Sequence, residues 1–176
     1  DYDSYNQSAK YLSYLLTPTT VCLAIPLYQQ LDMLKKNFTA ILIGISAGVI
    51  TSLVSILAMA MVFGLSHKEY VTLLPKSITT AIAVGVSEEL GGYVAITVAA
   101  ILITGVFGNI IATSCCKWFR IKSSISKGLA IGTSAHAMGT TKAMEMGEVE
   151  GAMSSLAIVV AGLLTVILAS VFAMFY

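Results

Sequence analysis

The sequence predicts an all-α integral membrane protein, with polytopic helices and discontinuous (broken or re-entrant) segments like those of secondary transporters. Its 176 residues are 57% hydrophobic and 11% charged, whereas soluble domains are roughly 45–50% apolar and about 25% charged. Residues 37–66, 91–116 and 151–176 carry no charged side chain, and each run exceeds the ~20 residues that cross a ~30 Å hydrocarbon core. A soluble bundle would need polar helix faces, which these runs lack.

The elements are expected in a regular order along the chain. Residues 8–16 predict a short helix that breaks at residues 17–20, and a polar turn over 29–37 precedes the first spanning helix. Residues 67–69 close that helix, and a second break follows at 73–80. The apolar segment 77–86 has ten uncharged residues, roughly 15 Å of helix, which cannot cross a bilayer alone. The other spans are expected at 93–114 and 151–176.

An internal repeat is visible at an offset of 59 residues, which aligns Thr20 with Thr79. We predict one membrane domain over 1–176, with repeat units at 17–66 and 75–116 and a third polar segment plus last helix at 128–176. The units run inverted if the short segment enters and leaves on one side, and parallel if residues 70–90 cross. Counting basic residues in the loops does not separate these topologies. Because Pro18 and Pro75 precede hydroxyl-rich helix starts, we favour discontinuous segments, which in matching halves of transporters indicate a binding site.

The first candidate site residues are the hydroxyls Ser77, Thr79 and Thr80, which follow Pro75. Proline fits the first turn of a helix, whose free N–H groups favour an anion. These hydroxyls therefore predict a site for a carboxylate or small anion. The alternative is that they only cap a helix or satisfy the broken backbone. Thr20 is a candidate for the same role in the first unit.

The second group of candidates lies between Gly128 and Gly151, where polar residues are dense. Such groups at membrane depth usually line a path or a site. His136 and Thr140 stand four apart and are expected to share a helix face. The imidazole could donate to a carboxylate or take up a transported proton, or it could be a structural histidine bonded to a carbonyl. Lys142 and Glu145 predict an ion pair. The candidates in this segment are Ser134, His136, Thr140, Thr141, Lys142 and Glu145.

Several classes of function are disfavoured by the residues present. No second histidine or cysteine stands at ligand spacing, so no metal site is expected. The net charge of +1 indicates no nucleic-acid partner. No nucleophile elbow, phosphate loop or paired carboxylate is present, so we expect no enzyme, no catalytic residue and no cofactor.

Small residues recur four apart on several predicted helices. Gly44–Gly48, Gly128–Gly132 and Gly147–Gly151 fit the pattern for close helix contact. We expect a homodimer held by the long uncharged helices. The first five residues read like a loop cut from a longer chain.

Three blocks carry a resemblance to the LrgB/CidB family of bacterial membrane proteins. They are residues 16–28, residues 75–80, and residues 132–140 continuing through 145–154. The resemblance covers nearly the whole chain and implies a multi-pass protein of the bacterial plasma membrane. Members of the family tend to be longer at the N-terminus, so the resemblance also implies that this chain lacks one or two spanning helices at its start. It implies two descriptions of function: a carrier of small monocarboxylates such as pyruvate or glycolate, or a holin-like or antiholin-like protein that influences murein hydrolase export and lysis.

The residues favour the carrier, because a holin lesion needs no built-in anion site. The partners expected are a small organic anion, the lipid bilayer and an LrgA/CidA-like membrane protein. Proton coupling and sodium coupling both stay open.

Overall fold

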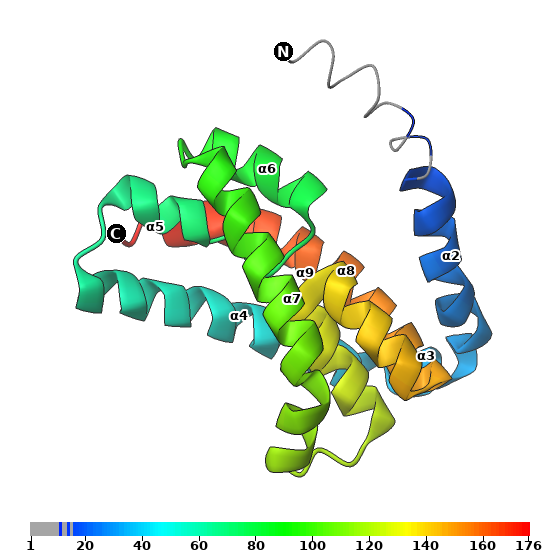
Figure 1. Ribbon diagram of the computed structural model, residues 1–176. Helices are drawn as coiled ribbons and strands as arrows, with labels where there is room; N and C mark the ends of the chain where they lie inside the picture. Colours follow the sequence, from blue (N-terminus) through cyan, green and yellow to red (C-terminus); the bar gives the residue numbers. More distant parts are fainter. Residues whose placement is uncertain (1–10, 12–13, 15) are drawn as a thin grey trace.

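The computed structural model describes residues 11, 14 and 16–176, and the regular elements in these residues are all helices. Their order confirms the predicted all-α fold class (Figure 1). The helices are α2 Leu16–Gln29, α3 Leu31–Lys36, α4 Phe38–Phe63, α5 His67–Leu73, α6 Thr80–Glu89, α7 Val94–Trp118, α8 Ser124–Met146 and α9 Glu148–Ala173.

Three of these helices are long and apolar enough to cross a membrane, as the uncharged runs predicted. They are α4, α7 and α9, with 26, 25 and 26 residues. The ends of α4 and α9 lie together at one end of the molecule (Figure 1). There the Tyr176 hydroxyl donates to the carbonyl of Leu65 at 2.6 Å, and the Tyr70 hydroxyl donates to Phe172 O at 2.9 Å.

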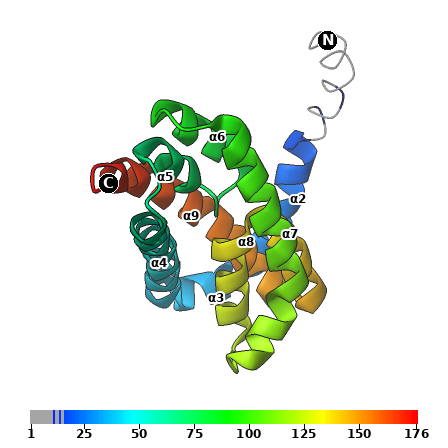
Figure 2. The ribbon, with the colours of Figure 1, turned by 60° about the vertical axis from the view of Figure 1, so that its left-hand side comes forward.

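Helices α5 and α6 form a hairpin between the spans α4 and α7. α4 ends at Gly64, which has a φ of 62°, and a capping box starts α5: Ser66 N donates to Glu69 Oε2 at 2.7 Å, and Glu69 N donates back to Ser66 Oγ at 3.3 Å. Residues 67–69 therefore begin a helix, and the expectation that they close the span is wrong. The start of α5 and the end of α6 lie at the same end of the molecule (Figures 1 and 2).

The turn of this hairpin reaches the middle of α4. Residues 74–79 are not helical, and Ser77 Oγ in the turn shares a hydrogen bond of 3.0 Å with Ser52 Oγ. The break predicted at Pro75 is therefore confirmed. α6 has ten residues, and it returns toward the end where the hairpin began.

A second interruption divides α8 at His136. This residue has φ 42° and ψ −138°, and two helices meet there. Such a φ is rare for a residue other than glycine. A discontinuous segment predicted from the sequence is thus present at residues 74–79, and the break at His136 is one that the sequence analysis did not predict.

The break predicted at residues 17–20 is wrong. α2 runs from Leu16 through Pro18 and Pro26 to Gln29 without interruption. Pro18 falls in the first turn of α2, where the missing N–H is tolerated. The backbone of Thr20 is therefore part of α2 and does not start a helix, and its side chain lies outside the described residues. The expected helix over 8–16 falls mostly outside them as well.

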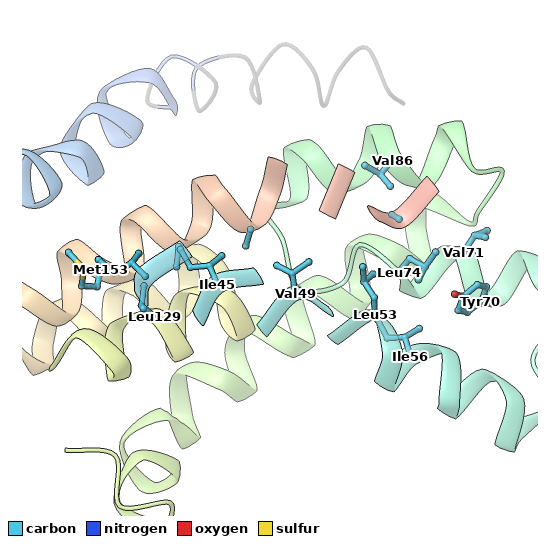
Figure 3. Packing of buried hydrophobic residues seen from close by; sticks show 14 of the residues in the cluster. Ile45, Val49, Leu53, Ile56, Tyr70, Val71, Leu74, Val86, Leu129 and Met153 are labelled. Carbon is cyan, nitrogen blue, oxygen red and sulfur yellow. The ribbon is translucent and has the colours of Figure 1, made fainter. Parts of the chain in front are cut away.

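The main apolar core lies between α4, the hairpin and α9. Buried residues recur along one face of α4 and meet Tyr70, Leu74 and Val86 of the hairpin region (Figure 3). The α4 residues in this core include Ile41, Ile45, Val49, Leu53 and Ile56.

Glycines allow α8 and α9 to approach closely. A Cβ on Gly128 would lie 2.5 Å from Glu150 O, and one on Gly132 would lie 2.4 Å from Ser154 O. A Cβ on Gly48 of α4 would lie 3.1 Å from Thr133 Oγ1 of α8. The predicted close helix contacts are confirmed at these positions, and they form within one chain.

Candidate functional site

The two helix interruptions meet at one residue of α7, Ile101. Ile78, in the hairpin turn, packs in a buried cluster with Ile101 and Ala83. His136, at the break in α8, donates from Nε2 to the Ile101 carbonyl at 3.1 Å. Segments more than 50 residues apart in the sequence are thus joined through α7.

Lys76 is the cation that this arrangement brings into the interior. It lies in the hairpin turn and is half-buried, and its Nζ donates to Ser77 Oγ at 3.2 Å. Because Ser77 is also bonded to Ser52 of α4, the Lys76 ammonium belongs to a short polar chain that ends on a spanning helix. Among the described residues, no carboxylate forms an ion pair with Lys76.

Lys76 is absent from the candidates predicted from the sequence, because a lysine between two apolar segments is typical of a loop. The signal was present: Lys76 follows Pro75 and precedes three hydroxyl residues within the next four positions. A cation beside a helix break can lie in the interior for the same reason as the candidate hydroxyls of Ser77, Thr79 and Thr80.

A cavity of about 600 Å³ lies between α4, the hairpin turn and the first half of α8. Its size is within the range of small-molecule sites, roughly 300–1,000 Å³. Small and polar side chains from three parts of the fold line it. The polar ones are Thr51, Ser52, Ser55, Lys76, Ser77, Ser126, Thr133 and Ser134.

A second cavity of about 590 Å³ lies between the first half of α8 and α7. Its walls are more apolar and include Phe107 and Ile111. Lys76, Ala130 and Ser134 line both cavities. The Lys76 side chain therefore lies where the two cavities adjoin, with the Ala130–Ser134 face of α8 between them.

Of the candidate residues predicted from the sequence, Ser77 and Ser134 line the first cavity, between α4, the hairpin turn and α8. Thr79 is the N-cap of α6 without a side-chain capping bond, and Thr80 is the first residue of α6. Both are half-buried, and neither is part of the lining of the two cavities around Lys76.

His136 and Thr140 contact different helices, so the prediction that they share a face is wrong. The His136 ring bonds to α7. The Thr140 hydroxyl donates to His136 O at 2.9 Å and shares a 2.7 Å hydrogen bond with Ser154 Oγ of α9. The faces separate because the backbone leaves helical geometry at His136. The carbonyl bond of His136 is the structural alternative that the sequence left open.

The remaining candidates lie near the end of α8. Thr141 is exposed and accepts from Asn109 Nδ2 at 2.9 Å. The predicted ion pair of Lys142 with Glu145 is confirmed at 2.6 Å. The pair is not buried, since 66% of the Glu145 side chain is exposed.

Three apolar spans and two polar helix interruptions define a polytopic membrane protein with discontinuous helices. The chain belongs to the LrgB-like family, whose model matches residues 1–175, and it is a multi-pass protein of the bacterial plasma membrane. The chain is 42% identical over 171 residues to proteins named antiholin-like protein LrgB from Bacillus mycoides (strain KBAB4) and Bacillus cereus (strain B4264). Each alignment covers 97% of this chain and 74% of the relative. No solved structure matches the chain with significance.

Proposed function

We propose that this protein carries a small organic anion, such as a monocarboxylate like pyruvate or glycolate, across the plasma membrane, with the anion bound at Lys76. The supporting observation is the Lys76 ammonium in the hairpin turn, without a carboxylate partner in the described residues and bordering two cavities. A charge at membrane depth is expensive unless something compensates it. A bound carboxylate supplies that compensation.

The neighbours of Lys76 suit a carboxylate. Hydrogen bonds between an ammonium and a carboxylate are about twice as strong as neutral ones. The Ser77 hydroxyl lies on the cavity wall beside the ammonium. The Ser134 hydroxyl donates to Ala130 O at 2.7 Å, so it would have to leave that carbonyl to donate to a carboxylate. Apolar surface on the α7 side suits the methyl or methylene part of a short organic acid.

The repeat predicted from the sequence, with units at 17–66 and 75–116, stays a prediction. We infer a further pair of units, in which the hairpin α5–α6 with α7, and the two halves of α8 with α9, are inverted repeats. In each unit an interrupted segment precedes one spanning helix. The hairpin returns to the end where α9 finishes, whereas α8 begins at the opposite end, where α7 finishes (Figure 1). Transporters with such repeats place the solute site where the interrupted segments meet.

A second candidate function is lysis control, favoured by the name antiholin-like that the relatives carry. In this role the protein would act with an LrgA/CidA-like membrane partner and would need no solute site. Anion transport and lysis control are compatible if the flux of anions across the membrane is itself the signal that controls lysis. Proton or sodium coupling would then decide the direction of flux.

Uptake of labelled pyruvate into proteoliposomes tests the carrier. We expect saturable uptake, and Lys76→Gln should raise the half-saturation concentration because a charged hydrogen bond worth about 1.5–3 kcal/mol is lost, a change of roughly 10- to 150-fold. The matched control is Lys68→Gln, since Lys68 is exposed and lies over the Tyr93 ring at 4.2 Å.

Two results would contradict the proposal. Non-saturable leakage of pyruvate and larger solutes alike, which is the behaviour of a pore, would reject the carrier. Saturable uptake with an equal half-saturation concentration for Lys76→Gln and the unaltered protein would reject Lys76 as the anion site.

A further inference from the structure

A basic cavity of about 460 Å³ lies where α7 ends and α8 begins. Four cationic side chains line it: Lys117, Arg120, Lys122 and Lys127. Lys127 alone among them has an acidic partner in the described part of the chain, Glu150 at 3.8 Å. Three positive charges therefore face this cavity without a carboxylate to balance them.

The chain reversal after α7 is what gathers these cations. Arg120 has a φ of 54°, and the Ile121 N–H bonds back to Cys116 O at 2.9 Å. This left-handed residue is strained for a side chain other than glycine. It turns the chain so that Lys122 and Lys127 face the same cavity as Lys117.

An apolar groove leads into this basic cavity. The cavity between α7 and α8 shares Cys116 and Ile121 with it and continues along α7 past Phe119, Ile111 and Phe107. The Phe107 side chain is 62% exposed, so the groove lies open on the lipid-facing surface of the span. The site thus has positive charge in the basic cavity and apolar surface along the groove. An amphiphilic anion complements this pattern.

The aromatic residues beside this cavity place it at the membrane surface. Trp118 and Phe119 are 81% and 69% exposed and contact each other with ring centroids 5.3 Å apart. Exposed tryptophan at the end of a spanning helix is typical of the headgroup level of a bilayer. Basic pockets at that level bind anionic headgroups.

We propose that this cavity binds the phosphate of an anionic phospholipid, with one acyl chain lying in the groove along α7. Lys117, Arg120 and Lys122 hold the phosphate, and Thr113 adds a hydroxyl on the α7 side. The phosphate would lie at the end of α7 and the start of α8, apart from Lys76, whereas the acyl chain would occupy the apolar cavity that Lys76 also borders.

The single tryptophan of the chain, Trp118, reports on this site directly. The full chain in mild detergent is titrated with phosphatidylglycerol or phosphatidylcholine that carries a nitroxide quencher on the acyl chain. We expect phosphatidylglycerol to quench Trp118 at the lower concentration. Lys117→Gln with Lys122→Gln should weaken its binding by about 5-fold per cation, roughly 25-fold together.

The matched control is Lys35→Gln with Lys36→Gln, which removes the same charge from an exposed helix end. This control should keep the preference for phosphatidylglycerol. Equal quenching by the two lipids, or an equal loss in both double variants, would overturn the proposal. Displacement of the lipid by equimolar inorganic phosphate or glycerophosphoglycerol would also overturn it, because the site would then hold a soluble anion.

Discussion

The imidazole of His136 donates from Nε2 to the Ile101 carbonyl at 3.1 Å and thereby ties the break in α8 to α7. Gly105, one turn further along α7, leaves the space for the ring. A Cβ at Gly105 would lie 2.7 Å from His136 Cε1 and 2.7 Å from Met138 Sδ. The histidine side chain is 4% exposed, so this contact is part of the packed interior.

Gly105→Ala should therefore destabilise the protein. Overpacking of a tight contact costs about 1–3 kcal/mol, which a lowered midpoint of thermal unfolding in detergent would report. Gly85→Ala on α6 is the matched control, because nothing lies within 4 Å of a Cβ there. Equal midpoints for the two variants would show that His136 adapts without cost.

The hydroxyl pair of Thr140 and Ser154 should matter more than either residue alone suggests. Both side chains are buried, so Thr140→Val leaves the Ser154 hydroxyl without this partner and costs roughly 1–3 kcal/mol. Adding Ser154→Ala to Thr140→Val should cost less than the sum of the single changes. Thr39→Val, at an exposed position of α4, is the control. Strict additivity of the two changes would argue against coupling.

Transport should depend on the hydroxyls at the start of α6 if they contact the solute. Thr80→Val keeps the shape and removes the hydroxyl, and a lost contact of about 1–3 kcal/mol corresponds to roughly 5- to 150-fold in affinity. Combining it with His136→Ala should lower pyruvate uptake further in proteoliposomes. Unchanged uptake by the double variant would restrict the solute site to Lys76, Ser77 and Ser134.

We expect a homodimer held by the long uncharged helices. Gly48 packs against α8 in the same chain, so the dimer contact falls to the opposite face of α4, where Ile43, Ile50 and Val54 are exposed. Single cysteines at these positions, in a chain whose own cysteines are replaced, should crosslink between copies. A monomer in lipid and in mild detergent would contradict this, as would crosslinks only through residues 134–141.

The spans were predictable because uncharged length alone decides them. The break at residues 74–79 was predictable from Pro75, whereas Pro18 has the same chemistry and breaks nothing, because it falls in the first turn of a helix. α2 also continues through Pro26, well inside the helix, so a proline alone does not predict where a helix is interrupted.

The depth of Lys76 and the break at His136 were not predictable in the same way. Hydropathy places Lys76 near an apolar segment but does not say which way the hairpin turns. The backbone at His136 departs from helical geometry without a proline or glycine at that residue. The hydrogen bond from the His136 ring to Ile101 of α7, 35 residues away in the sequence, holds His136 in this conformation.

The first half of α8 separates the two cavities with two of the smallest side chains, Ala130 and Ser134. Lys76 borders both spaces across this thin wall, so rotation about its side-chain bonds could shift a captured anion from one to the other while every helix stays in place. The partition, rather than the cation, would then set how large a solute can pass. A larger side chain at position 130 would leave the Lys76 ammonium able to bind the anion but would block the passage of the anion to the second cavity.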